Sequence, residues 1–388
     1  RTGPASYTDE FGIVKLVGDN VPRFDHDPTT RECKGLLIEE TRTNQITDSY
    51  DLTGSGWGNV NFDRTPFTTE ILAPNGKYES TKLILNTSSA QHYIQDTGMT
   101  KANGAERQCV SFWAKLTSSN YPILKSYITG AFAFTNYSQQ QFNLSTGVVT
   151  SGGGGSFTNH SAKMTKYPNG WWKCEYEATL NSSETTKRLQ FLANDGSSAA
   201  GNGTDGYYIW GVQVEVGSVV TSLIPTNGAT ATRGADNLLI DGEDFTNFYN
   251  QPEGTIFADY KVIGGDPEIM YLSNNASSRR IGLYEAGSNQ TRFIIGNGGT
   301  QADTTSAATA IGDNVKVAGA YKLNDIAAVK DGGTPSTDSN ATVPSDGAID
   351  RAYIGGYYDG TVEGVLGLRR LMYYPKRLPN SQLTTLTS

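Results

Sequence analysis

The sequence predicts an all-β protein in which a small N-terminal β-meander precedes two antiparallel β-sandwich domains. Its composition supports this prediction, because 44 glycines and many Thr, Ser and Asn residues separate short runs of Val, Ile, Tyr and Phe. Such runs are typical of half-buried strands joined by tight turns. The length of 388 residues exceeds what one core organises and indicates two or three domains. The chain also shows no heptad pattern and no exact internal repeat.

Residues 1–49 are the predicted meander. Apolar runs at 11–17, 21–24 and 33–40 are separated by "GDN" and "DHDPTTRE", which are rich in turn formers. A sheet this small buries little surface and is marginally stable by itself. We therefore expect it to pack on the next domain or on another copy of the chain.

Residues 50–233 are predicted to form the first sandwich. In "YYIWGVQVEV" the apolar residues alternate, which predicts that Tyr208 and Trp210 face the core and that Gln213 and Glu215 face outward. The turn-rich stretch "IPTNGATATRGADN" marks the end of this unit. The expected strands are 82–86, 109–117, 131–137, 140–150, 170–180, 188–195 and 206–217.

Residues 234–388 are predicted to form the second sandwich, followed by one short helix. Pro379 suits the first turn of a helix, and Leu383 and Leu386 would share one face of it. The expected strands are 253–262, 268–274, 279–287, 291–298, 314–323, 325–332, 351–360 and 362–379.

Charge and hydropathy argue against two classes of partner. The chain has 31 Lys and Arg against 39 Asp and Glu, a net charge of −8, and no cluster of basic residues of the kind that binds phosphates. No run of 18 apolar residues occurs, and the first residues lack the pattern of a signal peptide. We expect neither nucleic-acid binding nor membrane insertion.

Three cysteines, Cys33, Cys109 and Cys174, lie far apart in the sequence. Their odd number and wide spacing fit neither a disulfide framework nor a zinc knuckle. We expect buried free thiols.

The stretch "NVPRFDHDPTTRECKGLLIEETRTNQI", residues 20–46, resembles the N-terminal segment of bacteriophage tail and head-appendage proteins. In the second unit, "APNGKYESTKL", "NGWWKCEYE" and "YYIWGVQVEVGSVVTSLIPT" resemble a carbohydrate-binding-module-like sandwich. In the third, "GTIFADYKV" and "LGLRRLMYYPKRLPNSQLTTLT" resemble a concanavalin-like or laminin-G-like domain. The resemblance implies jelly-roll or concanavalin-like sandwiches.

The resemblance implies a structural protein of a bacteriophage virion, namely a tail fibre, spike or capsid appendage. Its lectin-like domains would adhere to host cell-surface glycans, and its other partners would be virion proteins. Two alternatives stay open: a capsule-degrading tail-spike glycosidase and a secreted bacterial glycan-binding protein. Since fold alone does not dictate function, the residues must decide between them.

The charged residues between 20 and 44 are the predicted assembly element of a homo-oligomer, by analogy with phage fibres a trimer. Arginines paired with carboxylates across an interface give both attraction and register. The alternative is that this segment caps the second unit of its own chain. The predicted assembly residues are Arg23, Asp25, Glu39, Glu40 and Arg42.

No catalytic signature surrounds the three histidines, so the sequence predicts a protein that is not an enzyme. Asp25 with Asp27, or Asp241 with Glu243 and Asp244, could supply the two carboxylates of a glycosidase. Acidic residues so close in sequence more often cap turns.

Flat aromatic faces bind the apolar side of a sugar ring. The candidate glycan-binding residues are Trp171 and Trp172 in "GWW" and Tyr357, Tyr358 and Asp359 in "GGYYDG". Core packing of these aromatic rings is the alternative, and at least one of the two tryptophans should be core.

No metal or other cofactor is expected. Concanavalin-like sandwiches often carry Ca²⁺, for which Asp331 or Asp359 offers suitable oxygens, but neither surrounding sequence has the dense acidic spacing of a strong calcium loop.

Overall fold

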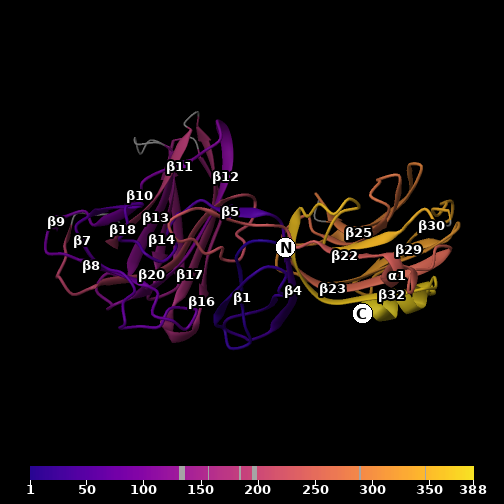
Figure 1. Cartoon of the computed structure of the whole chain (residues 1–388), viewed down its shortest axis with the longest axis horizontal. Coiled ribbons are helices and arrows are strands. Elements are labelled where there is room, and N and C mark those ends of the chain that lie inside the picture. The colour runs from indigo at the N-terminus through magenta and orange to yellow at the C-terminus, as the bar shows by residue number, and fades with distance from the viewer. Residues whose placement is uncertain (131–135, 156, 183–184, 195–198, 288–289, 346) are drawn as a thin grey trace.

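Two β-sandwiches lie side by side along the long axis of the molecule, and the N-terminal segment lies between them (Figure 1). The described strands pair in antiparallel sheets, which confirms the predicted all-β class. No described helix is long and apolar enough to cross a membrane. The structure, a computed structural model, describes residues 1–130, 136–155, 157–182, 185–194, 199–287, 290–345 and 347–388. The strand expected at 131–137 lies largely outside these residues.

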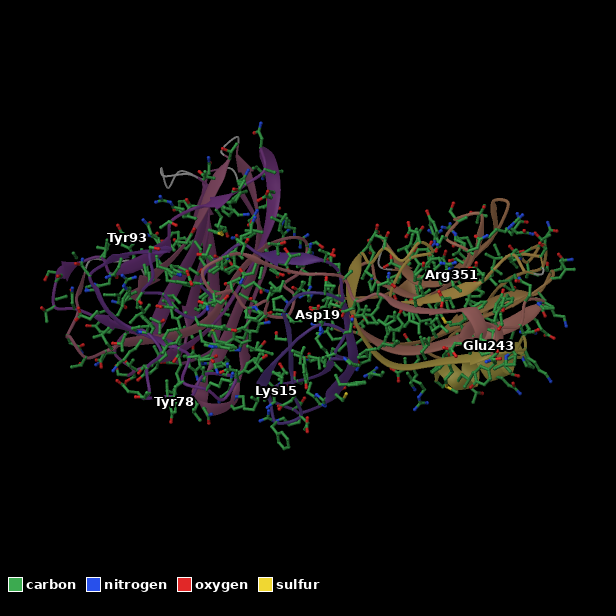
Figure 2. All side chains as sticks on the ribbon, viewed as in Figure 1. Lys15, Asp19, Tyr78, Tyr93, Glu243 and Arg351 are labelled. Carbon is green, nitrogen blue, oxygen red and sulfur yellow. The ribbon has the colours of Figure 1, made fainter. Side chains whose placement is uncertain are left out.

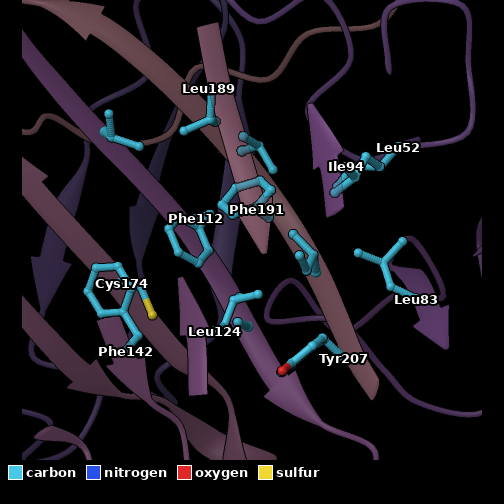
Figure 3. Packing of buried hydrophobic residues seen from close by; sticks show 14 of the residues in the cluster. Leu52, Leu83, Ile94, Phe112, Leu124, Phe142, Cys174, Leu189, Phe191 and Tyr207 are labelled. Carbon is cyan, nitrogen blue, oxygen red and sulfur yellow. The ribbon is translucent and has the colours of Figure 1, made fainter. Parts of the chain in front are cut away.

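The first sandwich consists of two facing sheets, of strand orders β15-β14-β13-β18-β10-β6, with β11 beside β18, and β16-β17-β12-β20-β8-β7. Its core is rich in aromatic rings (Figure 3). The Phe112 ring of one sheet lies 5.5 Å from Phe142 and 4.7 Å from Phe191 of the other, between centroids, so edge-to-face contacts join the sheets.

The strands of this unit are β6 (Trp57–Val60), β7 (Phe62–Thr65), β8 (Thr81–Leu85), β9 (Ser89–Ala90), β10 (Tyr93–Asp96), β11 (Met99–Thr100), β12 (Gly104–Leu116), β13 (Ile123–Gly130), β14 (Tyr137–Asn143), β15 (Val148–Gly154), β16 (Phe157–Lys166), β17 (Trp172–Ser182), β18 (Thr186–Ala193), β19 (Ala199–Ala200) and β20 (Gly206–Val216). A 3-10 turn, Pro168–Gly170, precedes β17.

The second sandwich has sheets of strand order β22-β31-β24-β25-β26-β27 and β3-β4-β32-β23-β28-β29-β30. Buried aliphatic and aromatic side chains from both sheets fill its core. Its strands are β3 (Phe24–His26), β4 (Cys33–Glu39), β22 (Leu238–Asp241), β23 (Glu253–Gly265), β24 (Glu268–Ser273), β25 (Arg279–Ala286), β26 (Gln290–Asn297), β27 (Thr300–Ala308), β28 (Asn314–Lys322), β29 (Ile326–Lys330), β30 (Ser336–Asp338), β31 (Arg351–Ile354) and β32 (Gly364–Tyr374).

Two short helices complete the described elements, α1 (Gly242–Thr246) and α2 (Asn380–Thr387). The predicted C-terminal helix is confirmed: Pro379 precedes α2, Leu383 is fully buried, and Leu386 packs beside it against β28 and β29.

The N-terminal segment forms short antiparallel pairs, as expected, but the second pair continues into another unit. β1 (Ala5–Thr8) and β2 (Val14–Val17) form a hairpin, whereas β3 and β4 extend the seven-stranded sheet because β4 pairs with β32. β5 (Arg42–Asn44) pairs with β21 (Ala231–Arg233). Gly367 of β32 permits this close approach, since a Cβ there would lie 2.2 Å from the Lys34 carbonyl oxygen.

The prediction that Gln213 and Glu215 face solvent is wrong, because both are fully buried. After β20 the chain folds back over this face of the strand. Gln213 Oε1 accepts the Ile224 amide at 2.6 Å, and a Glu215 carboxylate oxygen accepts the Thr221 amide at 3.1 Å. Backbone amides of the returning segment therefore replace water.

The expectation of buried thiols holds for Cys109 and Cys174 but is wrong for Cys33, which is exposed. Cys33 starts β4, next to the outermost strand of its sheet, β3. All three cysteines are free thiols.

Candidate functional site

Aromatic side chains gather on the outer face of the six-stranded sheet of the second sandwich, whose β25 is labelled in the upper part of the right-hand lobe in Figure 1. Arg351, labelled in Figure 2, belongs to β31, the strand that leads into the loop with the predicted sugar-binding residues. The cluster consists of Tyr271, Arg280, Tyr284, Tyr357 and Tyr358, and we call it the tyrosine platform.

Strand alternation explains why β25 contributes to the platform. Ile281 and Leu283 enter the core, which leaves Arg280, Gly282 and Tyr284 on the outer face. The same pattern holds in β24. The alternation of core and outer residues can be read in "RRIGLYEAG". It indicates a binding surface only once the structure shows which loop lies over the outer face.

Tyr271 is the buried centre of the platform. Its ring centroid lies 4.9 Å from that of Tyr357, edge to face, and 5.7 Å from that of Tyr284. The ring lies beside Gly282 of the neighbouring strand, where a Cβ would come within 2.1 Å of Tyr271 Cε1. The glycine therefore provides the space in which this ring lies against the sheet.

Arg280 joins the loop to the sheet. Its guanidinium carbon lies 5.7 Å from the Tyr357 ring centroid and 5.2 Å from that of Tyr358. Its Nη1 donates a hydrogen bond to the Tyr357 hydroxyl at 3.1 Å. Within the described residues, no carboxylate oxygen lies within the 4.0 Å ion-pair distance of Arg280.

The loop after β31 is held in one conformation by local hydrogen bonds. The Tyr357 amide donates to the Thr361 carbonyl at 2.7 Å, and the Asp359 carboxylate accepts the Thr361 amide at 3.0 Å. Ser273 of β24 donates its hydroxyl to the Tyr358 carbonyl at 2.6 Å. Asp359 itself is exposed, whereas Tyr357 and Tyr358 are partly exposed.

This arrangement offers the groups with which proteins bind sugars. Aromatic faces bury the apolar side of a pyranose, and hydroxyls and a guanidinium bind its polar edge. The structure thus brings Tyr357, Tyr358 and Asp359 together on a supported surface.

Of the two predicted tryptophans, Trp171 belongs to the interior and Trp172 is partly exposed. Trp171 is fully buried and donates its indole N–H to the Leu72 carbonyl at 3.0 Å, so it cannot stack on a sugar. Trp172 packs against the core of the first sandwich, and its indole N–H donates to the Leu144 carbonyl at 2.8 Å. Neither residue lies near the tyrosine platform, which belongs to the other sandwich.

The predicted assembly residues pair within the chain. Arg23 and Glu39 bind each other, and their side chains are 1% exposed, so they make an internal contact in place of the expected contact with a second copy. Asp25 pairs with Lys34 at 2.9 Å, and Glu40 pairs with Arg42 at 2.6 Å. The intramolecular pairing arises because β4 is an inner strand of the C-terminal sheet.

Glu39 is ionised in this cluster. Burial alone would raise the pKa of its carboxyl group, but Arg233 and Arg23 outweigh burial and lower that pKa to about 2. Hydrogen bonds from the Ser222 amide and hydroxyl act in the same direction.

The carboxylates considered for glycosidase chemistry either have local partners or are exposed to solvent. Asp27 accepts the Thr29 and Thr30 amides, each at 2.8 Å, as a turn cap does. Asp241, Glu243 and Asp244 are exposed beside the first turn of α1.

Among the described residues no three His, Cys, Asp or Glu side chains are arranged to hold a metal ion. Asp331 accepts the Lys316 amide at 2.8 Å and so joins the end of β29 to the neighbouring strand β28. Asp359 caps its own loop, as described above.

A hollow lies where the N-terminal segment meets both sandwiches. Its volume is about 280 Å³, and its walls include β16, β17, β23 and residues 220–223. Several charged side chains in it form ion pairs, among them Lys34 with Asp25 at 2.9 Å and Lys173 with Glu175 at 2.8 Å. These paired charges favour neither an anion nor a cation.

No protein-family model and no curated protein matches the sequence. Similar solved structures include Ruminococcus gnavus IT-sialidase CBM40, with 18% identity and a TM-score of 0.33 over 39% of this chain and 98% of that chain. Mouse laminin α1 chain domains LG4-5 are 12% identical, with a TM-score of 0.30, and the match covers 76% of this chain and 90% of that chain. Trypanosoma rangeli sialidase in complex with sialic acid is 14% identical, with a TM-score of 0.30, and the match covers 65% of this chain and 48% of that chain. These scores are too low to assign a shared function.

Proposed function

We propose that this chain is a non-catalytic glycan-binding protein whose second sandwich binds sugar at the tyrosine platform. The observation that carries the proposal is the pair of partly exposed rings, Tyr357 and Tyr358, supported by Tyr271 and Arg280. Rings fixed before binding lose little side-chain entropy on binding, which favours recognition by a small surface.

We further propose that the protein is a structural component of a bacteriophage virion: a fibre, spike or capsid appendage that adheres to host cells. The support is the resemblance of residues 20–46 to the N-terminal segments of such proteins. A single shallow site binds sugar weakly, so adhesion would require several copies in one particle, where multivalency raises avidity by about 100-fold or more. A homo-oligomer, with three copies by the same analogy, would supply them.

The proposal of a non-catalytic role is supported by the positions of the candidate catalytic carboxylates. The acidic residues that could have formed a glycosidase pair are ion-paired, cap turns or are exposed. When the protein is incubated with host capsule or envelope polysaccharide, the length of the polysaccharide should therefore stay unchanged. If the polysaccharide is cleaved, and a single Asp or Glu substitution in the protein abolishes the cleavage, the protein is a hydrolase and the proposed non-catalytic role is wrong.

Binding by the wild-type protein and its variants to a glycan array tests the site. We expect Tyr357→Ala and Tyr358→Ala each to weaken binding by about 10-fold or more, as loss of a central aromatic contact does. Tyr78→Ala is the matched control, because Tyr78 is a 51% exposed tyrosine outside the platform (Figure 2). Binding that survives both platform substitutions would place the site elsewhere.

The virion setting has a separate test. Antibodies against the chain, applied to purified phage particles of the source culture, should label one structure on the particle in electron micrographs. Recovery of the protein only in the particle-free medium would favour the secreted bacterial alternative.

A further inference from the structure

We infer that the tyrosine platform selects saccharides that carry an anionic group, a carboxylate or a sulfate, which Arg280 binds. This inference rests on the proposed function and adds the substrate class. It follows from the charge of Arg280 and from the acceptors available to it.

The other arginines of this face have acidic partners. Arg292 of β26 pairs with Asp303 of β27, and Arg351 of β31 pairs with Asp350 at 2.7 Å. Arg280 lies on β25, between these strands in the sheet, and has no such partner among the described residues. It therefore brings an uncompensated positive charge to the platform.

The environment of Arg280 makes this charge costly. The side chain is partly buried, and its Nε is shielded from solvent without a described hydrogen-bond acceptor. Removing a charged group from water is unfavourable unless it is paired or hydrogen-bonded. The faces of Tyr357 and Tyr358 offset part of the cost, since cation–π contacts contribute about 0.5–2 kcal/mol.

A second donor at the same place lacks an acceptor. The Tyr271 hydroxyl is buried without a described hydrogen-bond partner. Burial raises the pKa of Tyr271, so this group stays protonated and can only gain from an added acceptor. Tyr357 contacts both residues, since its ring lies 4.9 Å from the Tyr271 ring, between centroids, and its hydroxyl accepts a hydrogen bond from Arg280.

An anionic ligand would exchange one acceptor for a better one. At present Arg280 donates to a neutral hydroxyl, that of Tyr357. A carboxylate or sulfate oxygen in its place adds the attraction between two opposite charges, which the neutral hydroxyl lacks. The guanidinium can bind two oxygens of such a group at once, while the neighbouring rings cover the sugar.

The test is a glycan array that presents matched pairs: hexuronate glycans beside their carboxyl-reduced forms, and sulfated glycans beside unsulfated forms. The wild-type protein should bind the acidic member of a pair more tightly, and added salt should weaken that binding. The two sets of pairs distinguish carboxylate from sulfate. Arg280→Gln should weaken acidic binding by about 10- to 100-fold, as expected for loss of a charged hydrogen bond.

Arg292→Gln is the matched control, because it removes the same charge from the same face where an aspartate already compensates it. It should change binding by less than about 2-fold. Arg280→Lys keeps the charge without the planar fork and should retain the acidic preference at lower affinity. Melting temperatures of all variants separate loss of binding from loss of fold.

Equal binding to acidic and neutral members, or acidic binding unaffected by Arg280→Gln, would overturn the inference and leave the proposed function standing. Binding to no glycan at all would overturn the proposed function, and the inference with it.

Discussion

Arg23 and Glu39 form an ion pair that solvent does not reach: Arg23 Nη1 lies 2.5 Å from Glu39 Oε2, and each side chain is 1% exposed. Asp236, which is 213 residues after Arg23, binds the same guanidinium. Arg233 lies 3.2 Å from Glu39. The cluster thus fixes the N-terminal segment to the chain that connects the two sandwiches.

Glu39→Gln should destabilise the fold, because it leaves Arg23 and Arg233 buried without their shared counter-charge. Removing one partner of a buried pair costs about 3–5 kcal/mol in the free energy of unfolding. Urea denaturation at pH 7 measures this loss. Glu10→Gln, at an exposed position of the same segment, is the control and should change little. An equal effect of both substitutions would contradict the assigned role.

Because the pKa of Glu268 is raised in the folded chain, we expect the free energy of unfolding to fall as pH rises from about 5 to 8. Its burial, reinforced by the charges of Glu363 and Asp266, raises the pKa of its carboxyl group to about 8 in the folded chain, against an ordinary value of 4.5. Between these values the folded state holds a proton that the unfolded state has lost. Stability from this group is therefore full below pH 4.5 and is lost as pH rises through 8, with a slope of up to about 1.4 kcal/mol per pH unit.

Glu268→Gln should flatten this pH dependence and make the variant more stable than the wild type at pH 8, since glutamine resembles the protonated acid. Glu243→Gln, at an exposed position labelled in Figure 2, should keep the wild-type slope. Urea denaturation at pH 5, 6, 7 and 8 compares the three proteins. A variant with the slope of the wild type would show that Glu268 is ionised in the fold.

Gly282→Ala should disturb the platform from below. The added Cβ would lie 2.1 Å from Tyr271 Cε1, so the ring must move, and overpacking of this kind costs about 1–3 kcal/mol. We expect a lower melting temperature together with weaker glycan binding. At Gly299, in the turn between β26 and β27, a Cβ would meet no atom within 4 Å. Gly299→Ala should therefore leave both measurements unchanged.

The sequence predicted well what depends on local periodicity and composition. The C-terminal helix and many of the strands lie in short stretches whose turn formers and alternation are readable. The sequence missed β6, β16 and β27, and it merged β14 and β15 into one strand at 140–150. Tyr357 and Tyr358 stay predictions as sugar-binding residues. Arg280 was missed because an arginine on an outer strand face is ordinary. It becomes informative only when the structure shows which carboxylates lie near it.

Long-range partners could not be predicted. The charges near Arg23 indicated a need for pairing, but nothing local identified Asp236 as the partner. The alternation placed Gln213 and Glu215 opposite the core residues Val212 and Val214 correctly, yet it could not reveal that a later segment covers this face. The prediction that Tyr208 and Trp210 face the same core is wrong, because both belong to a separate buried cluster. Trp171 was ambiguous because a surface aromatic and a core aromatic have the same local signature.

The thiols should differ sharply in reactivity. Cys33 is exposed, whereas Cys109 and Cys174 are buried, and burial raises the pKa of both buried thiols. In the native protein at pH 8, a disulfide reagent such as Ellman's reagent should label one thiol rapidly. The other two should react on addition of denaturant. Rapid reaction of all three in the native state would contradict the burial of Cys109 and Cys174.

The pairing of β4 with β32 has a consequence for biosynthesis. During translation β3 and β4 leave the ribosome long before β32, with which β4 pairs, because the first sandwich and most of the second lie between them in the sequence. The intervening sandwich is in effect an insertion. Its entry and exit lie side by side, where Asn44 of β5 faces Ala231 of β21. The nascent chain must keep an incomplete sheet soluble while the insertion folds, so a ribosome that stalls before β32 would expose an unpaired strand edge to its neighbours.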